Sequence, residues 1–153
     1  IRPAEVELMQ LLERVVNDLS LQVAGSGSTL ALVQHSPVHG NWDEFRIEQV
    51  IVNLLTNALR YGCGNPVEIS VMLEGDEVRI DVRDQGMGIS ETERQRIFEP
   101  FERGVGNREV KGLGLGLYIS RQLAEAHGGR LSVAQGEVCG SVFSLTLPLN
   151  ASY

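Results

Sequence analysis

Residues 51–61 read IVNLLTNALRY and combine the period of a helix with an unusual choice of polar residues. Positions three, four, seven and eight apart share one face of a helix. One face therefore carries a polar stripe, which consists of Asn53, Asn57, Arg60 and Tyr61. A second face carries an apolar stripe suited to a core, which consists of Ile47, Ile51, Leu54, Leu55 and Ala58. Paired amides on one face are typical of a ligand set for a metal or a polar small molecule, although a helix that hydrogen-bonds a neighbouring loop shows the same pattern.

The composition of the whole chain predicts one globular domain. Its 153 residues are 42% hydrophobic and 22% charged, which suits a chain with a genuine core. The net charge of −7 argues against a duplex nucleic acid partner, because phosphate binding needs clustered Lys and Arg. Cys63 and Cys139 have no CxxC spacing and fit a reducing compartment. No apolar run approaches the roughly 18 residues of a membrane span.

The segments before this stretch predict a helix, a turn and two short strands. Residues 4–20 carry apolar side chains near helical spacing, directly after Pro3. Residues 25–28, GSGS, predict a flexible turn. We expect a strand over residues 29–34, paired with residues 38–42. Asp43 is expected to cap the central helix, which then runs to Tyr61.

The clearest strand signal follows the central helix. Residues 67–73 and 78–82 alternate apolar and polar side chains around a turn, which predicts an antiparallel hairpin. The second strand leads into DQGMGI at residues 84–89. An acidic residue at a strand end, followed by alternate glycines, is typical of backbone that comes close to a ligand. Ser90 is expected to cap a short helix that ends near Ile97.

A glycine-rich segment, GLGLGL at residues 112–117, is expected to begin a helix that ends near His127. Glycines at a helix start expose its free N–H groups, and the helix dipole favours an anion there. Residues 103–112, just before it, are glycine-rich and locally basic, so this region predicts a phosphate cradle. We expect His127 to stabilise the helix end, and residues 130–133 and 141–147 to form the last two strands.

These features, together with FEPF at residues 98–101 and GSVFSLTLP at 140–148, occur in a familiar order. From about residue 4 to 149, the chain resembles the ATP-binding catalytic domain of sensor histidine kinases, in the wider superfamily of Bergerat-fold ATPases. The resemblance implies an α/β (α+β) two-layer sandwich. Its sheet is expected to be mixed and mostly antiparallel, with about five strands and three main helices on one face.

The resemblance also implies a site for ATP and Mg²⁺. Asn57 is expected to coordinate Mg²⁺ with help from Asn53, since Mg²⁺ prefers oxygen ligands. Arg60 stands where the family usually has lysine and is expected to face a phosphate. Tyr61 is expected to lie against adenine or ribose, and Asp84 to accept a hydrogen bond from the adenine amino group. The other expected nucleotide contacts are Gly86, Gly88, Ile89, Phe101, Arg103, Lys111, Gly112, Leu113, Gly114, Leu115 and Gly116.

The groups that serve the reaction itself are expected to be Asn53, Asn57, Arg60 and Lys111, and Asn53 separates subclasses of the superfamily. Hydrolytic members, and protein serine kinases of this fold, tend to have a glutamate four residues before the metal-binding asparagine. An amide cannot activate water as a glutamate does. The resemblance therefore favours a histidine kinase. Hydrolytic ATPase, serine kinase and nucleotide-gated binding module remain the alternatives.

None of the chain's histidines, His35, His39 and His127, is followed by the acidic residue of the family's phosphoacceptor pattern. We therefore expect the acceptor on a separate helical dimerisation domain, with a response regulator as the indirect partner. The chain starts at Ile1 rather than Met, and we expect residues 1–153 to form one domain of a longer protein. That protein is expected to be a homodimer and this piece a monomer. A cytoplasmic location is expected, either free or anchored in the inner membrane.

Overall fold

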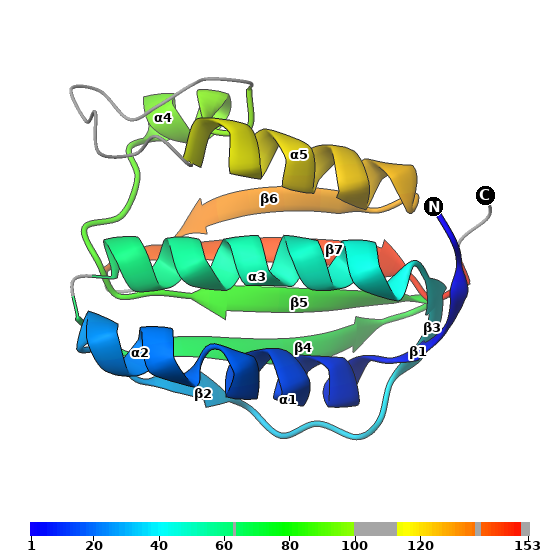
Figure 1. Cartoon of the computed structure of the whole chain (residues 1–153). Coiled ribbons are helices and arrows are strands. Elements are labelled where there is room, and N and C mark those ends of the chain that lie inside the picture. Colours follow the sequence, from blue (N-terminus) through cyan, green and yellow to red (C-terminus); the bar gives the residue numbers. More distant parts are fainter. Residues whose placement is uncertain (63, 100–112, 137–138, 151–153) are drawn as a thin grey trace.

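The computed structural model describes residues 1–62, 64–99, 113–136 and 139–150, the side chains of 113–115 excepted. Figure 1 shows two layers, a sheet with helices on one of its faces. The described residues form a five-stranded sheet in the order β2-β4-β5-β7-β6, antiparallel except between β2 and β4. The strands are β2 (Leu30–Leu32), β4 (Val67–Glu74), β5 (Glu77–Arg83), β6 (Arg130–Gln135) and β7 (Ser141–Pro148). The predicted mixed, mostly antiparallel two-layer sandwich is confirmed.

Three main helices cover the sheet, with α3 between the other two (Figure 1). They are α1 (Leu8–Asp18), α3 (Glu44–Tyr61) and α5 (Leu113–Ala126). The predicted cap of α3 is confirmed, because Asp43 Oδ1 accepts a hydrogen bond from the Arg46 N–H at 3.2 Å. Short helices α2 (Ser20–Ser26) and α4 (Glu91–Arg96) flank them.

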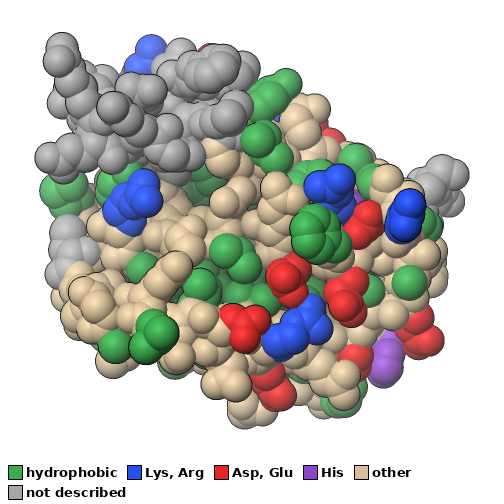
Figure 2. Space-filling model, viewed as in Figure 1, with side chains coloured by type: hydrophobic (Ala, Val, Ile, Leu, Met, Phe, Trp, Pro, Cys, Tyr) green, Lys and Arg blue, Asp and Glu red, His purple; other side chains and the backbone are tan. Residues whose placement is uncertain are grey.

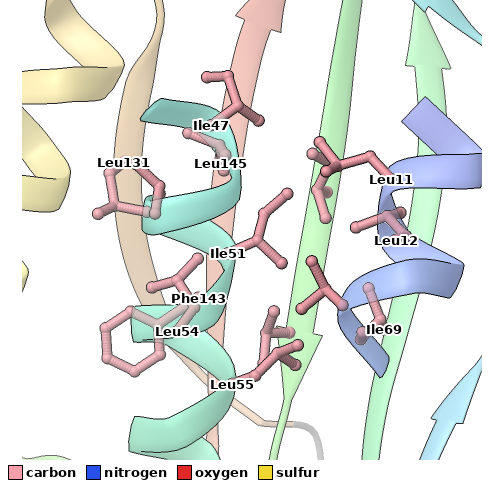
Figure 3. Close-up of a cluster of buried hydrophobic side chains, with 14 of the residues drawn as sticks. Leu11, Leu12, Ile47, Ile51, Leu54, Leu55, Ile69, Leu131, Phe143 and Leu145 are labelled. Atoms are coloured by element: carbon pink, nitrogen blue, oxygen red, sulfur yellow. The ribbon is translucent and has the colours of Figure 1, made fainter. Parts of the chain in front are cut away.

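The apolar stripe of α3 is the centre of the core. Ile47, Ile51, Leu54 and Leu55 have no exposed surface. Figure 3 shows them in one cluster with residues of α1 and of the sheet, including Leu12, Ile69, Phe143 and Leu145. Each such side chain contributes about 1.5–3 kcal/mol when it is fully buried. Burial of this stripe holds α3 against the sheet, and the orientation of its polar stripe follows from that.

The prediction of one helix over residues 4–20 was wrong at both ends. Ala4–Glu7 forms strand β1, and α1 begins only at Leu8, where the Glu7 carboxylate accepts hydrogen bonds from Met9 N and Gln10 N. After Asp18 the chain enters a second short helix, α2. Val6 is buried as a residue of strand β1. It also fits a helical period, because over only four residues the alternation of a strand and the period of a helix can place the same residue on the buried face.

Two other local predictions also need correction. The segment 25–28 is not wholly a turn, because α2 continues through Ser26 and ends at Gly27, which has φ of 77°. Strand β3 (His39–Trp42) does not pair with β2; it pairs with β1, with Ala4 opposite Trp42. The partner of β2 is β4.

The remaining predicted elements agree with the structure. Ile69 pairs with Val82 and Val71 with Ile80 in the predicted hairpin, and Ser90 caps α4 through a hydrogen bond from Glu93 N. In the described part of the chain, no helix has both the length and the apolar character to cross a membrane. On the helix-covered face shown in Figure 2, acidic and basic side chains are interspersed rather than gathered by sign.

His127 joins the C-terminal end of α5 to the N-terminal end of α3. Its ring is fully buried, with Nδ1 2.7 Å from the Leu123 carbonyl and Nε2 3.2 Å from Asp43 N. Because the Asp43 N–H can only donate, Nε2 accepts that bond and Nδ1 carries the proton. The expected structural role of His127 is confirmed, and it sets how the two helices lie together.

Candidate nucleotide-binding site

The polar stripe of α3 faces a region bounded by α5 and by the loop after β5. Asn53, Asn57 and Tyr61 are half-buried on α3, and Arg60 is exposed. Figure 1 shows the C-terminal end of α3 and the N-terminal end of α5 at the same side of the molecule. The positive end of the α5 dipole therefore lies beside the polar stripe, which favours an anionic ligand there.

The side-chain oxygen of Asn57, Oδ1, is buried without a hydrogen-bond donor among the described residues. Buried acceptors are nearly always paired, because an unpaired one loses its hydrogen bonds to water without replacement. An amide oxygen in this state is the type of ligand that Mg²⁺ takes alongside phosphate oxygens and water. The residue present therefore fits the expected metal.

Asn53 connects α3 to α5. Its Nδ2 donates to the Gly116 carbonyl at 3.3 Å and to Ser120 Oγ at 3.0 Å. A carbonyl can only accept, so the nitrogen must point to α5, and the orientation of the amide is determined by this network. Oδ1 of Asn53 accepts no hydrogen bond from the described residues. The two amides thus present oxygen atoms one helical turn apart, and Asn53 is anchored to a second helix.

Ser120 was missed by reasoning from the sequence. It has no exposed surface, although it lies four residues after Gly116 in a helix that the sequence predicts. The spacing places Ser120 on the same helix face as Gly116, and this was the available signal. What could not be read from the sequence was that this face meets Asn53.

Asp84 lies at the end of β5 and only 5% of its surface is exposed. Its Oδ1 accepts a hydrogen bond from the Gly86 N–H at 3.0 Å, and its own N–H donates to the Ser141 carbonyl at 3.0 Å. Burial raises the pKa of the Asp84 carboxyl, and hydrogen bonding to the backbone of Gly86 and Ser141 opposes that rise. A buried carboxylate is suited to select a ligand by accepting a hydrogen bond from it.

The glycines after Asp84 allow close contacts within the protein. A Cβ at Gly86 would lie 2.0 Å from the Tyr61 carbonyl oxygen, so this loop packs directly on the end of α3. Gly88 has φ of 79° and lies next to Gly140, where a Cβ would come within 2.1 Å of the Asp84 carbonyl. The observed close approaches are thus to neighbouring backbone, and they hold Asp84 beside the C-terminal end of the polar stripe.

The other predicted contacts are distributed unevenly. Ile89 is half-buried against the core. Gly116 is in the first turns of α5, and a Cβ there would meet the Asn53 amide at an ordinary 3.7 Å. Leu113, Gly114 and Leu115 belong to α5, but their side chains are not described. The predicted contacts Phe101, Arg103, Lys111 and Gly112 lie outside the described residues.

Phe98, from the same segment as Phe101, is buried and packs edge-to-face on Phe143 of β7, with ring centroids 6.2 Å apart. This contact attaches the chain after α4 to the sheet. In the described part of the chain, no group of three or more His, Cys, Asp or Glu could hold a metal ion.

Comparison with known proteins places these features in a family. The sequence pattern of the family described as "Histidine kinase-, DNA gyrase B-, and HSP90-like ATPase" matches residues 42–151. The chain is 36% identical to a bacteriophytochrome of Pseudomonas aeruginosa over 136 residues, which is 87% of this chain and 18% of that protein. It is 38% identical to the sensor protein TorS of Escherichia coli over 144 residues, 93% of this chain and 16% of TorS. The chain thus spans less than a fifth of the length of these curated relatives.

Solved structures of histidine kinases have a similar fold. The catalytic domain of the histidine kinase ThkA superposes with a TM-score of 0.87 at 25% identity, covering 99% of this chain and 100% of that one. A second structure holds ThkA in complex with the response regulator protein TrrA; its kinase chain matches at 26% identity with a TM-score of 0.81, covering 96% of this chain and 42% of that chain.

Proposed function

Because the chain belongs to the family of histidine kinase-, DNA gyrase B- and HSP90-like ATPases, we propose that it is the ATP-binding catalytic domain of a sensor histidine kinase. Its site binds Mg²⁺-ATP, and the γ-phosphoryl group passes to a histidine on a separate domain. The observation that carries this proposal is the buried Oδ1 of Asn57, an acceptor without a donor in the described structure. Bound Mg²⁺ would satisfy this atom.

The residues of the polar stripe would divide the ligand between them. Asn57 Oδ1, assisted by Asn53 Oδ1, would hold the metal, which would supply positive charge to the phosphates. Arg60 provides a positive charge for a phosphate, and Tyr61 lies against adenine or ribose. The Asp84 carboxylate accepts a hydrogen bond from the adenine amino group, which selects the base.

The remaining contacts surround the phosphates and the base. Gly86 lets the loop that carries Asp84 pack on the end of α3, and Gly88 lies against Gly140. Gly86, Gly88 and Ile89 are proposed contacts of the base. The start of α5 directs its dipole and free N–H groups toward the phosphates. The further contacts that we propose are Phe101, Arg103, Lys111, Gly112, Leu113, Gly114, Leu115 and Gly116, with Lys111 a candidate for the γ-phosphate.

Transfer rather than hydrolysis follows from Asn53. A water molecule attacks a phosphate efficiently only when a base removes its proton or a group orients it. The Asn53 amide cannot take a proton, and its nitrogen is already bonded to α5. A neutral imidazole needs no base to act as a nucleophile through its free nitrogen. ATP in this site is therefore protected until the acceptor histidine arrives.

The proposal extends to the protein that contains this domain. The acceptor histidine lies on a helical dimerisation domain, and the phosphoryl group then moves to a response regulator. This domain alone is a monomer, and the longer protein is a homodimer. Because ATP is an intracellular ligand, the domain functions in the cytoplasm, whether or not the longer protein is anchored in the inner membrane.

Calorimetry with Mg²⁺-ATP tests the metal assignment. Wild type is expected to bind, and Asn57→Ala to bind at least tenfold more weakly. Asn17→Ala, which removes an exposed amide from α1, is the matched control and should bind like wild type. Equal binding by Asn57→Ala would show that Asn57 is not a metal ligand.

Incubation with radiolabelled ATP and a histidine-containing helical hairpin domain tests the reaction. The label should appear on the hairpin domain as an acid-labile phosphohistidine, with little label on the chain itself. Rapid steady release of inorganic phosphate by the chain alone would instead support a hydrolytic ATPase, and an acid-stable phosphoserine would support a serine kinase.

A further inference from the structure

The Asn53 amide is held by two acceptors that come from one helix. Gly116 offers a backbone carbonyl and Ser120 a hydroxyl, at 3.3 and 3.0 Å from Nδ2. The two residues are four apart in α5, so both acceptors lie on one face of that helix. Nothing in the proposed reaction itself requires Ser120, which is fully buried.

Burial of a serine in the middle of a helix needs a partner. A buried hydroxyl without a hydrogen bond costs free energy, and a mid-helix serine often bonds the carbonyl four residues earlier. Here Ser120 Oγ instead accepts a hydrogen bond from a side chain of the neighbouring helix. The contact therefore joins α3 to α5 at the level of the amide pair.

We propose that Ser120 is a positioning residue for the metal site. Together with the Gly116 carbonyl it holds the nitrogen of Asn53, so that Oδ1 of Asn53 stays available on the stripe that it shares with Asn57. This inference rests on the function proposed above, because it assigns the metal to that stripe. Ser120 does not touch the ligand and acts only through Asn53.

The loss of one anchor has a defined consequence. With Ser120 replaced by alanine, the Asn53 amide keeps only the longer bond to the Gly116 carbonyl. The amide can then rotate about its side-chain bonds, and its oxygen is less often in place for the metal. The expected effect is on the part of ATP affinity that depends on Mg²⁺.

Calorimetry with ATP, in Mg²⁺ and in excess chelator, tests this inference on wild type, Ser120→Ala, Asn53→Ala and the double variant. Ser120→Ala should weaken Mg²⁺-ATP binding roughly three- to tenfold, the range that one net hydrogen bond supports. Metal-free ATP binding should not change. In the Asn53→Ala background, Ser120→Ala should have no further effect, because the residue through which it acts is gone.

Two further variants separate positioning from stability. Thr56→Val removes a hydroxyl that bonds only the backbone of its own helix, at Val52 O and Asn53 O, and should leave both affinities unchanged. Ser120→Thr retains the hydroxyl and should retain Mg²⁺-ATP affinity within about twofold, even if its extra methyl lowers the unfolding midpoint.

A measurement without nucleotide provides an independent readout. In NMR spectra of the free protein, the side-chain amide protons of Asn53 should exchange slowly in wild type and faster in Ser120→Ala. The inference fails if Ser120→Ala binds Mg²⁺-ATP like wild type, loses affinity equally without metal, or loses it equally in the Asn53→Ala background. If wild type itself does not bind Mg²⁺-ATP, the proposed function fails as well, which distinguishes the two failures.

Discussion

Asn57→Ala should make the ligand-free protein more stable. The buried Oδ1 of Asn57 has no donor among the described residues, and an unsatisfied buried acceptor costs about 1–3 kcal/mol. Because the residue is only half-buried, we take the lower limit of about 1 kcal/mol. Alanine also has a helix propensity about 0.5 kcal/mol better than asparagine, which offsets a similar loss of packing contacts. The net gain in unfolding free energy is about 1 kcal/mol.

The gain should be visible in both thermal and urea unfolding. For a chain of this length, about 1 kcal/mol corresponds to a rise of about 2–4 °C in Tm. Asn17→Ala on α1 is the control, since it replaces an exposed asparagine near a helix end and should change Tm by less. A lower Tm for ligand-free Asn57→Ala would refute the reasoning, because it would mean that Oδ1 makes a stabilising hydrogen bond.

Adding ligand should reverse the order of stability. A ligand that binds only the folded state stabilises it by about 2.7 kcal/mol at one hundred times its Kd. Wild type should gain this from Mg²⁺-ATP, whereas a variant that binds tenfold more weakly gains only about 1.4 kcal/mol at the same ligand concentration. The difference of about 1.3 kcal/mol exceeds the advantage of about 1 kcal/mol that the ligand-free variant has, so wild type should become the more stable protein. If the variant remains more stable at saturating Mg²⁺-ATP, its loss of affinity is below about fivefold, less than the tenfold that a metal ligand requires, and the metal assignment is wrong.

Three other substitutions test the surroundings of the site. Gly86→Ala would place a Cβ 2.0 Å from the Tyr61 carbonyl oxygen and should lower the unfolding free energy by about 1–3 kcal/mol in urea titrations. Gly116→Ala meets the Asn53 amide only at 3.7 Å, so we expect it to raise the unfolding midpoint through a helix propensity gain of up to about 1 kcal/mol. Asp84→Asn should stabilise the ligand-free protein at neutral pH: the folded-state pKa of Asp84 is raised, so its charged form opposes folding above that pKa. The difference in unfolding free energy between Asp84→Asn and wild type should become smaller as the pH falls from the raised folded-state pKa to the ordinary pKa of an aspartate. Urea titrations at several pH values in this range would measure the difference.

Elements defined by a local period were predictable from the sequence. The apolar stripe of α3 and the alternation in β4 and β5 each repeat several times, so one misleading residue does not change the prediction. Strand β1 shows the limit, because four residues contain too few repeats and Val6 fits a helix as well. Its partner is β3, more than thirty positions later, and no local pattern indicates such a pairing.

The site residues also divide into those that a local pattern predicts and those whose role depends on how separate elements pack. The amides of Asn53 and Asn57 were predictable because they share one helix face, and so was an acidic residue at the end of β5. Ser120 was not, because its role depends on how α5 lies against α3. The glycine pattern predicted backbone that comes close to a ligand, and this stays a prediction. The close neighbour that the structure shows at Gly86 is the end of α3.

Two polar groups that reduce stability among the described residues, those of Asn57 and Asp84, are also among those that the sequence marks as functional. Asn57 keeps a buried oxygen without a donor, and Asp84 keeps a buried carboxylate whose pKa is raised by burial. Folding alone would favour apolar replacements at both positions, since burial of unpaired polar or charged groups is unfavourable. Asn53 and His127 are equally polar, but their nitrogens are hydrogen-bonded to protein groups and they connect α3 with α5. The Asn57 Oδ1 lacks a donor among the described residues, and the Asp84 carboxylate accepts from the Gly86 N–H yet keeps a raised pKa. Under the proposed function, a bound ligand would supply the further partners that offset these losses of stability.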